Sequence, residues 1–161
     1  MSDLQAIADR VEIEALRGEF TDAVMMNDHD RLASLFTPDG AVRIPLGGIE
    51  AAGRDEIRAL GARRQALAEY FLQTTHPGTI QLHGDTATGR AYLSEVARLR
   101  GGGSHLNYFV YHDRYRRTPD GWRFIERVAE FGYVDTTPLA GSAPSAAGEP
   151  VGLTARNTSA S

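Results

Sequence analysis

Apolar side chains recur at helical spacing over the first 26 residues, at Leu4, Ile7, Ala8, Val11, Leu16, Phe20, Ala23 and Val24. A repeat near 3.6 residues predicts one long amphipathic helix that ends at about Met26. Asn27 and Asp28 are both favourable N-caps, and they separate this helix from a short second one. The apolar positions of the second helix are Leu32, Leu35 and Phe36, and the turn Pro38-Asp39-Gly40 is expected to end it.

A third helix is expected to begin near Arg54, after a loop that Gly47-Gly48 opens. Asp55 and Glu56 stand in its first turn, where the helix dipole favours anions. Its apolar positions are Ile57, Leu60, Ala62 and Leu67. Residues 41–46 (AVRIPL), which lie before this helix, predict a short strand, and Pro45 favours a place at the edge of a sheet.

From Tyr70 onward the apolar repeat changes to two residues, which is typical of strands. The pattern predicts four of them, at residues 71–82, 86–99, 106–117 and 122–134. Three connectors that contain glycine favour hairpins between these segments, namely His83-Gly84-Asp85, Gly101-Gly102-Gly103 and Pro119-Asp120-Gly121. Helices followed by an antiparallel meander predict an α+β fold, with the helices packed in the concave face of a strongly curved, mainly antiparallel sheet. Such a cone-like α+β barrel leaves an apolar cavity suited to a small molecule.

The composition changes after Thr137 to a segment rich in Pro, Ala, Gly and Ser. We therefore interpret residues 1–137 as one domain, and residues 138–161 as a C-terminal tail that is mobile unless it docks on a neighbour. The chain shows no internal repeat.

Charge and composition exclude several classes of function. A net charge of −4 gives no basic surface for nucleic acid, and no apolar run approaches a membrane span. The acidic, amphipathic start lacks the parts of a signal peptide. The absence of cysteine excludes disulfides, thiolate metal sites and thiol nucleophiles, and no histidine has metal-ligand spacing. We expect a soluble cytoplasmic protein that binds a small molecule and needs neither a metal nor an organic cofactor.

Side-chain alternation along the strands brings charged residues onto otherwise apolar rows. Arg127 is the lone charge in the row that ends with Phe131 and Tyr133, and Glu95 is the lone charge in its own row. If these rows face the same way as the row of Asn107 and Tyr111, one cavity contains Glu95, Asn107, Tyr111 and Arg127. Two structural alternatives stay open: Arg127 snorkels to water at a strand end, or Glu95 and Arg127 form a buried ion pair.

The opposite face of the last two strands carries Trp122, Phe124, Val128, Leu106, Tyr108 and Val110. An exposed apolar patch of this size favours association with another copy of the chain. The sequence therefore predicts a homo-oligomer.

His76 is the histidine that we single out as a candidate base. It ends an apolar segment in the sequence TTHPG, where Pro77 favours an extended conformation. Histidine titrates near neutrality and is the usual general base in enzymes. Most lone histidines are structural, and the remaining four histidines fall in predicted turns or strand faces.

Four segments resemble the SnoaL-like branch of the nuclear-transport-factor-2-like superfamily: RLASLFTPDGAV, TTHPGT, GDTATGRAYL and YRRTPDGWRFIER. The resemblance covers about residues 1–141 and extends to hexachlorocyclohexane dehydrochlorinase and scytalone dehydratase. It implies the curved α+β fold and, from the dehydrochlorinase, a trimer, with a dimer as the second choice. It also implies that a histidine at the place of His76 removes a proton and that an arginine at the place of Arg127 lies in the pocket.

Two positions depart from that pattern. Met25 stands where the resemblance places an aspartate that orients the histidine, and Phe20 stands where the dehydrochlorinase has a lysine. Asp22, one turn earlier, or Glu95, across the cavity, could replace the aspartate. A third alternative is that no acid–base pair survives.

The sequence thus favours a cofactor-independent lyase, isomerase or cyclase that acts on a small, largely apolar, carbonyl-bearing or polyketide-like molecule. His76 would move a proton, Glu95 or Asp22 would orient it, and Arg127 with Tyr111 and Asn107 would hold the developing oxyanion. The apolar walls would come from Val24, Met25, Phe71, Leu93 and Phe131. The alternatives are a non-catalytic ligand-binding or scaffold protein on the same fold, and a protein-interaction module that uses the outer sheet face.

Overall fold

The computed structural model describes residues 2–144, and the expected tail from residue 145 onward lies outside the described residues. The three expected helices are α1 (Asp3–Met25), α2 (His29–Ser34) and α3 (Arg54–Leu67). Side chains cap the first two, because the Ser2 hydroxyl accepts a hydrogen bond from the Gln5 amide and the Asp28 carboxylate accepts one from the Arg31 amide. Within the described residues, no helix is long and apolar enough to cross a membrane.

The strands form one mixed sheet of six, in the order β2-β1-β6-β5-β4-β3. Their bounds are β1 Phe36–Ile44, β2 Ile49–Ala52, β3 Ala68–His83, β4 Thr86–Leu99, β5 Ser104–Thr118 and β6 Gly121–Asp135. The pairing of β1 with β6 is parallel, and the other pairings are antiparallel. The expected α+β class and curved, mainly antiparallel sheet are confirmed, although the sheet curves without closing into a barrel.

The start of the sheet differs from the sequence prediction. Strand β1 begins at Phe36 and runs through Pro38-Asp39-Gly40, which we expected to form a turn, and its pairing with β6 is interrupted by a bulge there. Gly40 permits this bulge, because a Cβ at that position would lie 2.8 Å from the Cβ of Phe36. A short 3₁₀ turn, Pro45–Gly47, then leads into β2, which the sequence pattern did not reveal.

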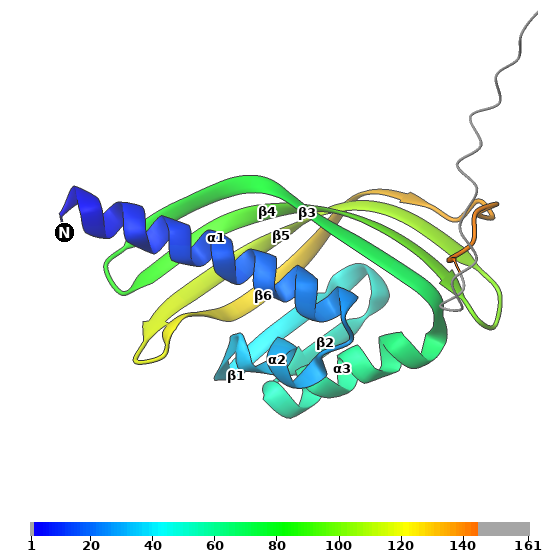
Figure 1. Ribbon diagram of the computed structural model, residues 1–161, viewed down its shortest axis with the longest axis horizontal. Coiled ribbons are helices and arrows are strands. Elements are labelled where there is room, and N and C mark those ends of the chain that lie inside the picture. Colours follow the sequence, from blue (N-terminus) through cyan, green and yellow to red (C-terminus); the bar gives the residue numbers. More distant parts are fainter. Residues whose placement is uncertain (1, 145–161) are drawn as a thin grey trace, which may run out of the picture.

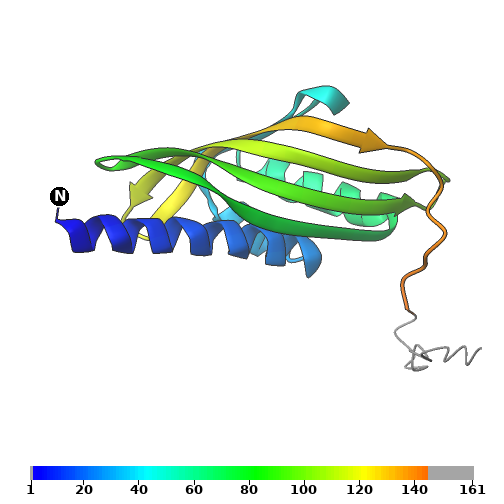
Figure 2. The same ribbon diagram turned by 90° about the horizontal axis from the view of Figure 1, so that it is seen from above.

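The sheet arches over the helices, and α1 lies along its concave face between β3 and β6 (Figure 1). Helices α2 and α3 fill one end of the concavity, beside β1 and β2. Seen from above, α3 lies behind the strands and α1 runs beside β3, and no helix lies over the convex face within residues 2–144 (Figure 2). The concave side is therefore where an enclosed site can form.

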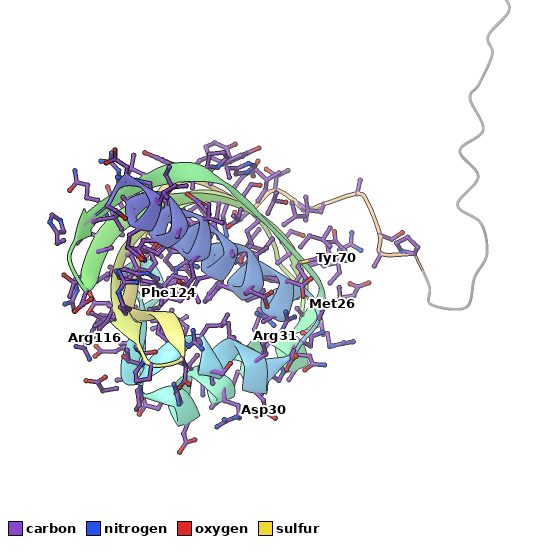
Figure 3. All side chains as sticks on the ribbon, turned by 60° about the vertical axis from the view of Figure 1, so that its left-hand side comes forward. Met26, Asp30, Arg31, Tyr70, Arg116 and Phe124 are labelled. Atoms are coloured by element: carbon purple, nitrogen blue, oxygen red, sulfur yellow. The ribbon has the colours of Figure 1, made fainter. Side chains whose placement is uncertain are left out.

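The hydrophobic core fills the space between α1 and the sheet. Phe20 of α1 meets Phe36, Tyr111 and Phe124 in edge-to-face contacts, and Phe36 meets Phe124 in a tilted one. Figure 3 shows Phe124 among the side chains between α1 and the sheet, whereas Asp30 lies on the outer surface. Aromatic pairs of this kind stabilise a core beyond the area that they bury.

One part of the expected outer patch is wrong. Trp122 and Phe124 are fully buried in the core, because a bulge at Ile125 reverses the alternation of side chains along β6. The convex face still exposes large apolar side chains, namely Leu72, Tyr92, Tyr108 and Tyr133. The homo-oligomer stays a prediction.

The first residues after the sheet return to it. The Arg98 guanidinium donates hydrogen bonds to the backbone carbonyls of Leu139 and Gly141, and the Leu139 amide donates one to the Ser104 hydroxyl. This part of the predicted tail is therefore held against β4 and β5.

Asp9 anchors the free end of α1 to the hairpin of β5 and β6. Its carboxylate is fully buried and accepts two hydrogen bonds from Arg117, at 2.7 and 2.8 Å, and one from the Trp122 indole at 3.1 Å. These charge-assisted bonds, with one from Gln5, hold the pKa of Asp9 well below its ordinary value even though burial raises it.

We expect Asp9→Asn to lower the free energy of unfolding by about 2 kcal/mol at pH 7, the usual value for hydrogen bonds to a charged group. A depressed folded-state pKa gives stability that is present above the unfolded pKa and is lost as the pH falls through the folded one. The difference should therefore shrink below pH 3.8, the ordinary value for Asp9. Urea titrations from pH 7 to pH 2 measure it, with exposed Asp39→Asn as the control. A difference that does not depend on pH would contradict the ion-pair account.

Candidate functional site

A largely apolar cavity of about 180 Å³ lies between the helices and the concave face of the sheet. Its lining comes from α1, α2, α3, β1, β2, β3, β4 and β5. The lining residues are Phe20, Val24, Leu32, Val42, Ile44, Ile49, Ile57, Leu60, Gly61, Arg64, Phe71, Gln73, Glu95 and Tyr111. The volume is below the range of about 300–1,000 Å³ that is usual for drug-sized ligands, so the cavity suits a small molecule.

Three polar residues form a row across the sheet at this cavity. Gln73 of β3, Glu95 of β4 and Asn107 of β5 stand directly opposite one another in the strand register. The Asn107 amide donates to one carboxylate oxygen of Glu95 at 3.2 Å, and the Gln73 amide donates to the other at 3.4 Å. The side-chain oxygens of Gln73 and Asn107 are buried and accept no hydrogen bond from the described residues. The row therefore fixes Glu95 and keeps two acceptors unused.

Glu95 is a carboxyl group in an unusually apolar place. Burial raises its pKa above the ordinary value, while hydrogen bonds from Asn107 and Gln73 and the charge of Arg64 oppose the shift. No ion pair joins Glu95 to any residue between 2 and 144. A carboxyl group with a raised pKa in a cavity is a candidate for both accepting and donating a proton.

Tyr111 presents a phenol to the same cavity. Its ring is held edge-on by Phe20 and Phe109, with ring centroids 5.8 and 5.3 Å away. Its hydroxyl has no hydrogen-bond partner among the residues that the structure describes. Burial raises the pKa of Tyr111, so the hydroxyl keeps its proton at neutral pH and can act as a donor.

Arg127 lies behind Tyr111 and does not line the cavity. Its guanidinium is 4.1 Å from the Tyr111 ring centroid and 4.4 Å from those of Phe20 and Phe124. It donates to both carboxylate oxygens of Asp113, at 2.8 and 3.1 Å, and both side chains are fully buried. Burial lowers the pKa of Arg127, but the Asp113 carboxylate and the neighbouring tyrosines together raise it above its ordinary value.

The expected role of Arg127 as the group that holds the oxyanion is therefore corrected. An arginine without accessible surface cannot touch a ligand in this conformation, and its partner is Asp113 rather than Glu95 or water. Asp113 lies on the same face of β5 as Tyr111, and the sequence analysis did not identify it as the counter-ion. Arg127 holds the ring of Tyr111 in place through a cation–π contact.

The ion pair continues toward α1 through a chain of buried polar groups. The Tyr115 hydroxyl donates to Asp113 at 2.6 Å and accepts from Nε of Arg17 at 2.8 Å. Arg17 also donates to the Thr79 carbonyl at 2.7 Å. Gly89 gives this guanidinium room, because a Cβ there would lie 2.5 Å from it.

Arg64 is the cavity residue that the sequence analysis missed. It stands on α3 at the seventh position after Ile57, so it continues the stripe of Ile57, Leu60 and Gly61 that faces the cavity. The spacing of Ile57, Leu60 and Gly61 could have identified Arg64. The sequence analysis instead counted Ala62 and Leu67 among the apolar positions of this helix, and both are exposed. Burial lowers the pKa of Arg64, since no carboxylate within residues 2–144 pairs with it.

His76 does not reach the cavity, contrary to our expectation. Within β3 the concave face carries Phe71, Gln73 and Thr75, so His76 falls on the convex face. There it is exposed and its ring contacts the Ser94 hydroxyl at 3.0 Å, in a shallow groove with Tyr92 and Tyr108. The alternation from Phe71 to His76 could have shown this, because the two positions have opposite parity.

The candidate partners of His76 are elsewhere as well. Asp22 is on the surface, in an ion pair with Arg31. The sulfur of Met25 accepts a hydrogen bond from the backbone N–H of Gln73 at 3.1 Å, so this methionine supports β3. Val24 and Phe71 line the cavity as expected, whereas Leu93 is buried in the core and Phe131 stacks on Phe109 without lining the cavity.

The described part of the chain contains no group of three or more His, Asp or Glu side chains placed to bind a metal ion. The chemistry that this site can be seen to offer is that of a carboxyl group, a phenol and a guanidinium around an apolar space.

Comparison with known proteins identifies the family. The model of the SnoaL-like domain matches residues 5–128. The chain belongs to the SnoaL-like family. An uncharacterized protein of Mycobacterium tuberculosis is 30% identical over 133 residues, which cover 80% of this chain and 88% of that protein.

Solved structures agree with this assignment. The structure of LinA, a hexachlorocyclohexane dehydrochlorinase, has a TM-score of 0.79 and 27% identity, and the match covers 90% of this chain and all of that one. A candidate scytalone dehydratase from Novosphingobium aromaticivorans has a TM-score of 0.74 at 20% identity, over 92% of this chain and all of that one. The second likeness shows the fold alone. The family resemblance seen in the sequence is thereby confirmed.

Removal of the counter-ion of Arg127 provides a test of the buried pair. We expect Asp113→Asn to lower the free energy of unfolding by about 3–5 kcal/mol, because it leaves a buried guanidinium without its charge partner. The double variant Asp113→Leu/Arg127→Met, in which neither charge remains, should lose less than Asp113→Asn alone. Chemical denaturation measures both, and a double variant that loses as much stability as Asp113→Asn would contradict the account.

The raised pKa of Glu95 predicts how stability depends on pH. A group whose folded-state pKa is raised contributes stability that is fully present below its unfolded pKa and is lost as the pH rises through the folded one. Relative to the wild type, Glu95→Gln should therefore become more stable as the pH rises from 4 to 8. His105 also acts on Glu95, so the comparison is repeated in a His105→Asn background. A stability difference that stays constant over this range would contradict the raised pKa.

Proposed function

We propose that this protein is a cofactor-independent lyase, isomerase or cyclase that moves a proton on a small, largely apolar molecule with a carbonyl group. The observation that carries the proposal is Glu95, a carboxyl group with a raised pKa that faces an apolar cavity. Catalytic acids and bases are commonly tuned by burial in this way. Glu95 replaces His76 as the proton-transfer residue.

In the proposed reaction the carboxylate of Glu95 removes a proton from the carbon beside the carbonyl. The electron pair of the broken C–H bond moves into the carbonyl and gives an enolate. The amide groups of Gln73 and Asn107 hold Glu95 by one hydrogen bond to each oxygen, so its position is fixed before the substrate arrives. A raised pKa makes Glu95 a stronger base than an exposed glutamate.

Tyr111 would stabilise the enolate oxygen. Its hydroxyl has no partner within residues 2–144 and keeps its proton, so it can donate a hydrogen bond to the developing negative charge. Arg127 supports this step from behind, because its guanidinium lies against the Tyr111 ring. Arg127 is therefore a positioning residue.

The fate of the proton and of the enolate distinguishes the three reaction types. If Glu95 returns the proton to a different carbon, the reaction is an isomerisation. If a group on the neighbouring carbon departs with its bonding electrons, the reaction is an elimination. If the enolate carbon attacks a second carbonyl, the reaction is a cyclisation. The membership of the SnoaL-like family and the likeness to LinA support this range of reactions.

The second candidate is a non-catalytic ligand-binding protein on the same fold. The outward direction of His76 and the methionine at position 25 favour it, because the acid–base pair that the family resemblance implies is absent from the cavity. Binding would then use the same cavity without proton transfer.

Proton exchange in D₂O tests the catalytic proposal. We expect the wild type to accelerate loss of the α-proton signals of small cyclic ketones and enones in ¹H NMR spectra. Glu95→Gln should lower this rate by about 10²–10⁴-fold, the usual contribution of a general base. His76→Ala serves as the control and should change the rate by less than about twofold, because His76 lies on the convex face.

Two outcomes would overturn the proposal. Loss of exchange in His76→Ala with Glu95→Gln unaffected would place the reaction at the histidine. Binding of the ketones, seen as line broadening, without exchange of any of them would favour the ligand-binding candidate.

A further inference from the structure

Arg64 is a cation in the wall of an apolar cavity, and no carboxylate within residues 2–144 forms an ion pair with it. Its Nη2 donates to the Val24 carbonyl at 3.0 Å and to the side-chain oxygen of Asn27 at 3.2 Å. Its guanidinium also lies 4.9 Å from the centroid of the Phe71 ring. These contacts hold the arginine at the end of α1 and fix where its charge lies.

The rest of the guanidinium is available to a ligand. Its Nε and Nη1 donate to no residue between 2 and 144, yet neither is sealed from solvent. A guanidinium presents its donors in a planar fork that matches the two oxygens of a carboxylate. Burial lowers the pKa of Arg64, so a bound anion would relieve an unfavourable charge.

Arg64 lies between two hollows of different character. With Val24 and Phe71 it lines the apolar cavity and also a polar hollow at the C-terminal end of α1. The other residues of this polar hollow are Met25, Asn27, Gln65, Ala68, Glu69, Tyr70 and Arg100. Figure 3 shows Met26, at the end of α1, and Tyr70 on the same side of the molecule. A molecule bound across this junction has its charged group at Arg64 and its apolar body in the cavity.

We propose that the ligand of this cavity is a small organic acid with one negative charge, whose carboxylate binds Arg64 while its apolar body contacts Ile44, Ile57 and Leu60. The proposal names the substrate class of the site and rests on the proposed function for the use of that cavity. A single charge fits better than a phosphate, because the cavity offers one cation and Glu95 faces the same space. Glu69 and Arg100 face the polar hollow, and Tyr111 and His105 lie near Glu95.

Matched acids and amides test the proposal. Benzoate and cyclohexanecarboxylate are compared with benzamide and cyclohexanecarboxamide, which have the same shape without the charge. Dissociation constants are measured at pH 7 by saturation-transfer NMR and calorimetry. We expect the wild type to bind each acid at least about tenfold more tightly than its amide, since a hydrogen-bonded charge pair in a desolvated site contributes about 1.4 kcal/mol or more.

The variants separate the charge of Arg64 from its structural contacts. Arg64→Met should remove the preference for the acid, and Arg64→Lys, which keeps the charge, should retain most of it. Arg63→Met removes the neighbouring exposed arginine of α3 and should leave the preference unchanged. A fall in fold stability alone would weaken acid and amide equally, so the ratio of the two constants reports the charge contact.

Each remaining outcome overturns the proposal. Equal binding of acid and amide by the wild type, a preference that survives in Arg64→Met, or no detectable binding of either acid at millimolar concentration would each do so. Loss of the preference in Arg100→Met but not in Arg64→Met would move the anion to the polar hollow. This test uses binding alone, so the exchange experiment with Glu95→Gln can succeed or fail independently of it.

Discussion

The ion pair between Arg127 and Asp113 organises the interior of this protein. Both groups are fully buried, and the guanidinium is surrounded by the rings of Phe20, Tyr111 and Phe124. Taking two charges out of water is unfavourable by several kcal/mol for each ion, so the pair persists only because its hydrogen bonds are well formed. It joins β5 to β6, reaches α1 through Tyr115 and Arg17, and sets the orientation of the Tyr111 ring at the cavity wall.

The cavity itself has a simpler chemistry, in which polar groups on opposite walls face a shared apolar space. Glu95 lies on the sheet, in a row with Gln73 and Asn107, and Arg64 approaches from α3. The two charges are not paired with each other. A protein that only needed to fill its core would gain stability from apolar residues at these positions, because unpaired buried charges are unfavourable. Their presence supports the proposal that the cavity binds a ligand.

Much of the fold could be predicted from the sequence, because its longest patterns are regular. The helices, the four long strands and the shared face of Glu95, Asn107 and Tyr111 follow from repeats of 3.6 and two residues. Alternation fails where the backbone is irregular, as at the bulge of Ile125, which brings Trp122 and Phe124 into the core.

Other features depend on contacts between distant segments, which no local pattern encodes. The partner of Arg127 is an example, since the choice of Asp113 rather than Glu95 depends on strand register. His76 was misplaced for a different reason. A likeness between short motifs transfers the position of a residue along the chain, but it does not transfer the face of the strand on which that residue lies.

The bulge in β6 has a consequence for how sequences of this kind can change. The bulge divides β6 into two parts. Before it, Trp122 and Phe124 are buried in the core, and after it, Arg127 stands opposite Asp113. One residue inserted or deleted between them would rotate one half of the strand by half a turn, so that interior side chains would meet water and exterior ones the core. In this segment the number of residues is as strongly constrained as their identity, and substitutions should accumulate in evolution where changes in length cannot.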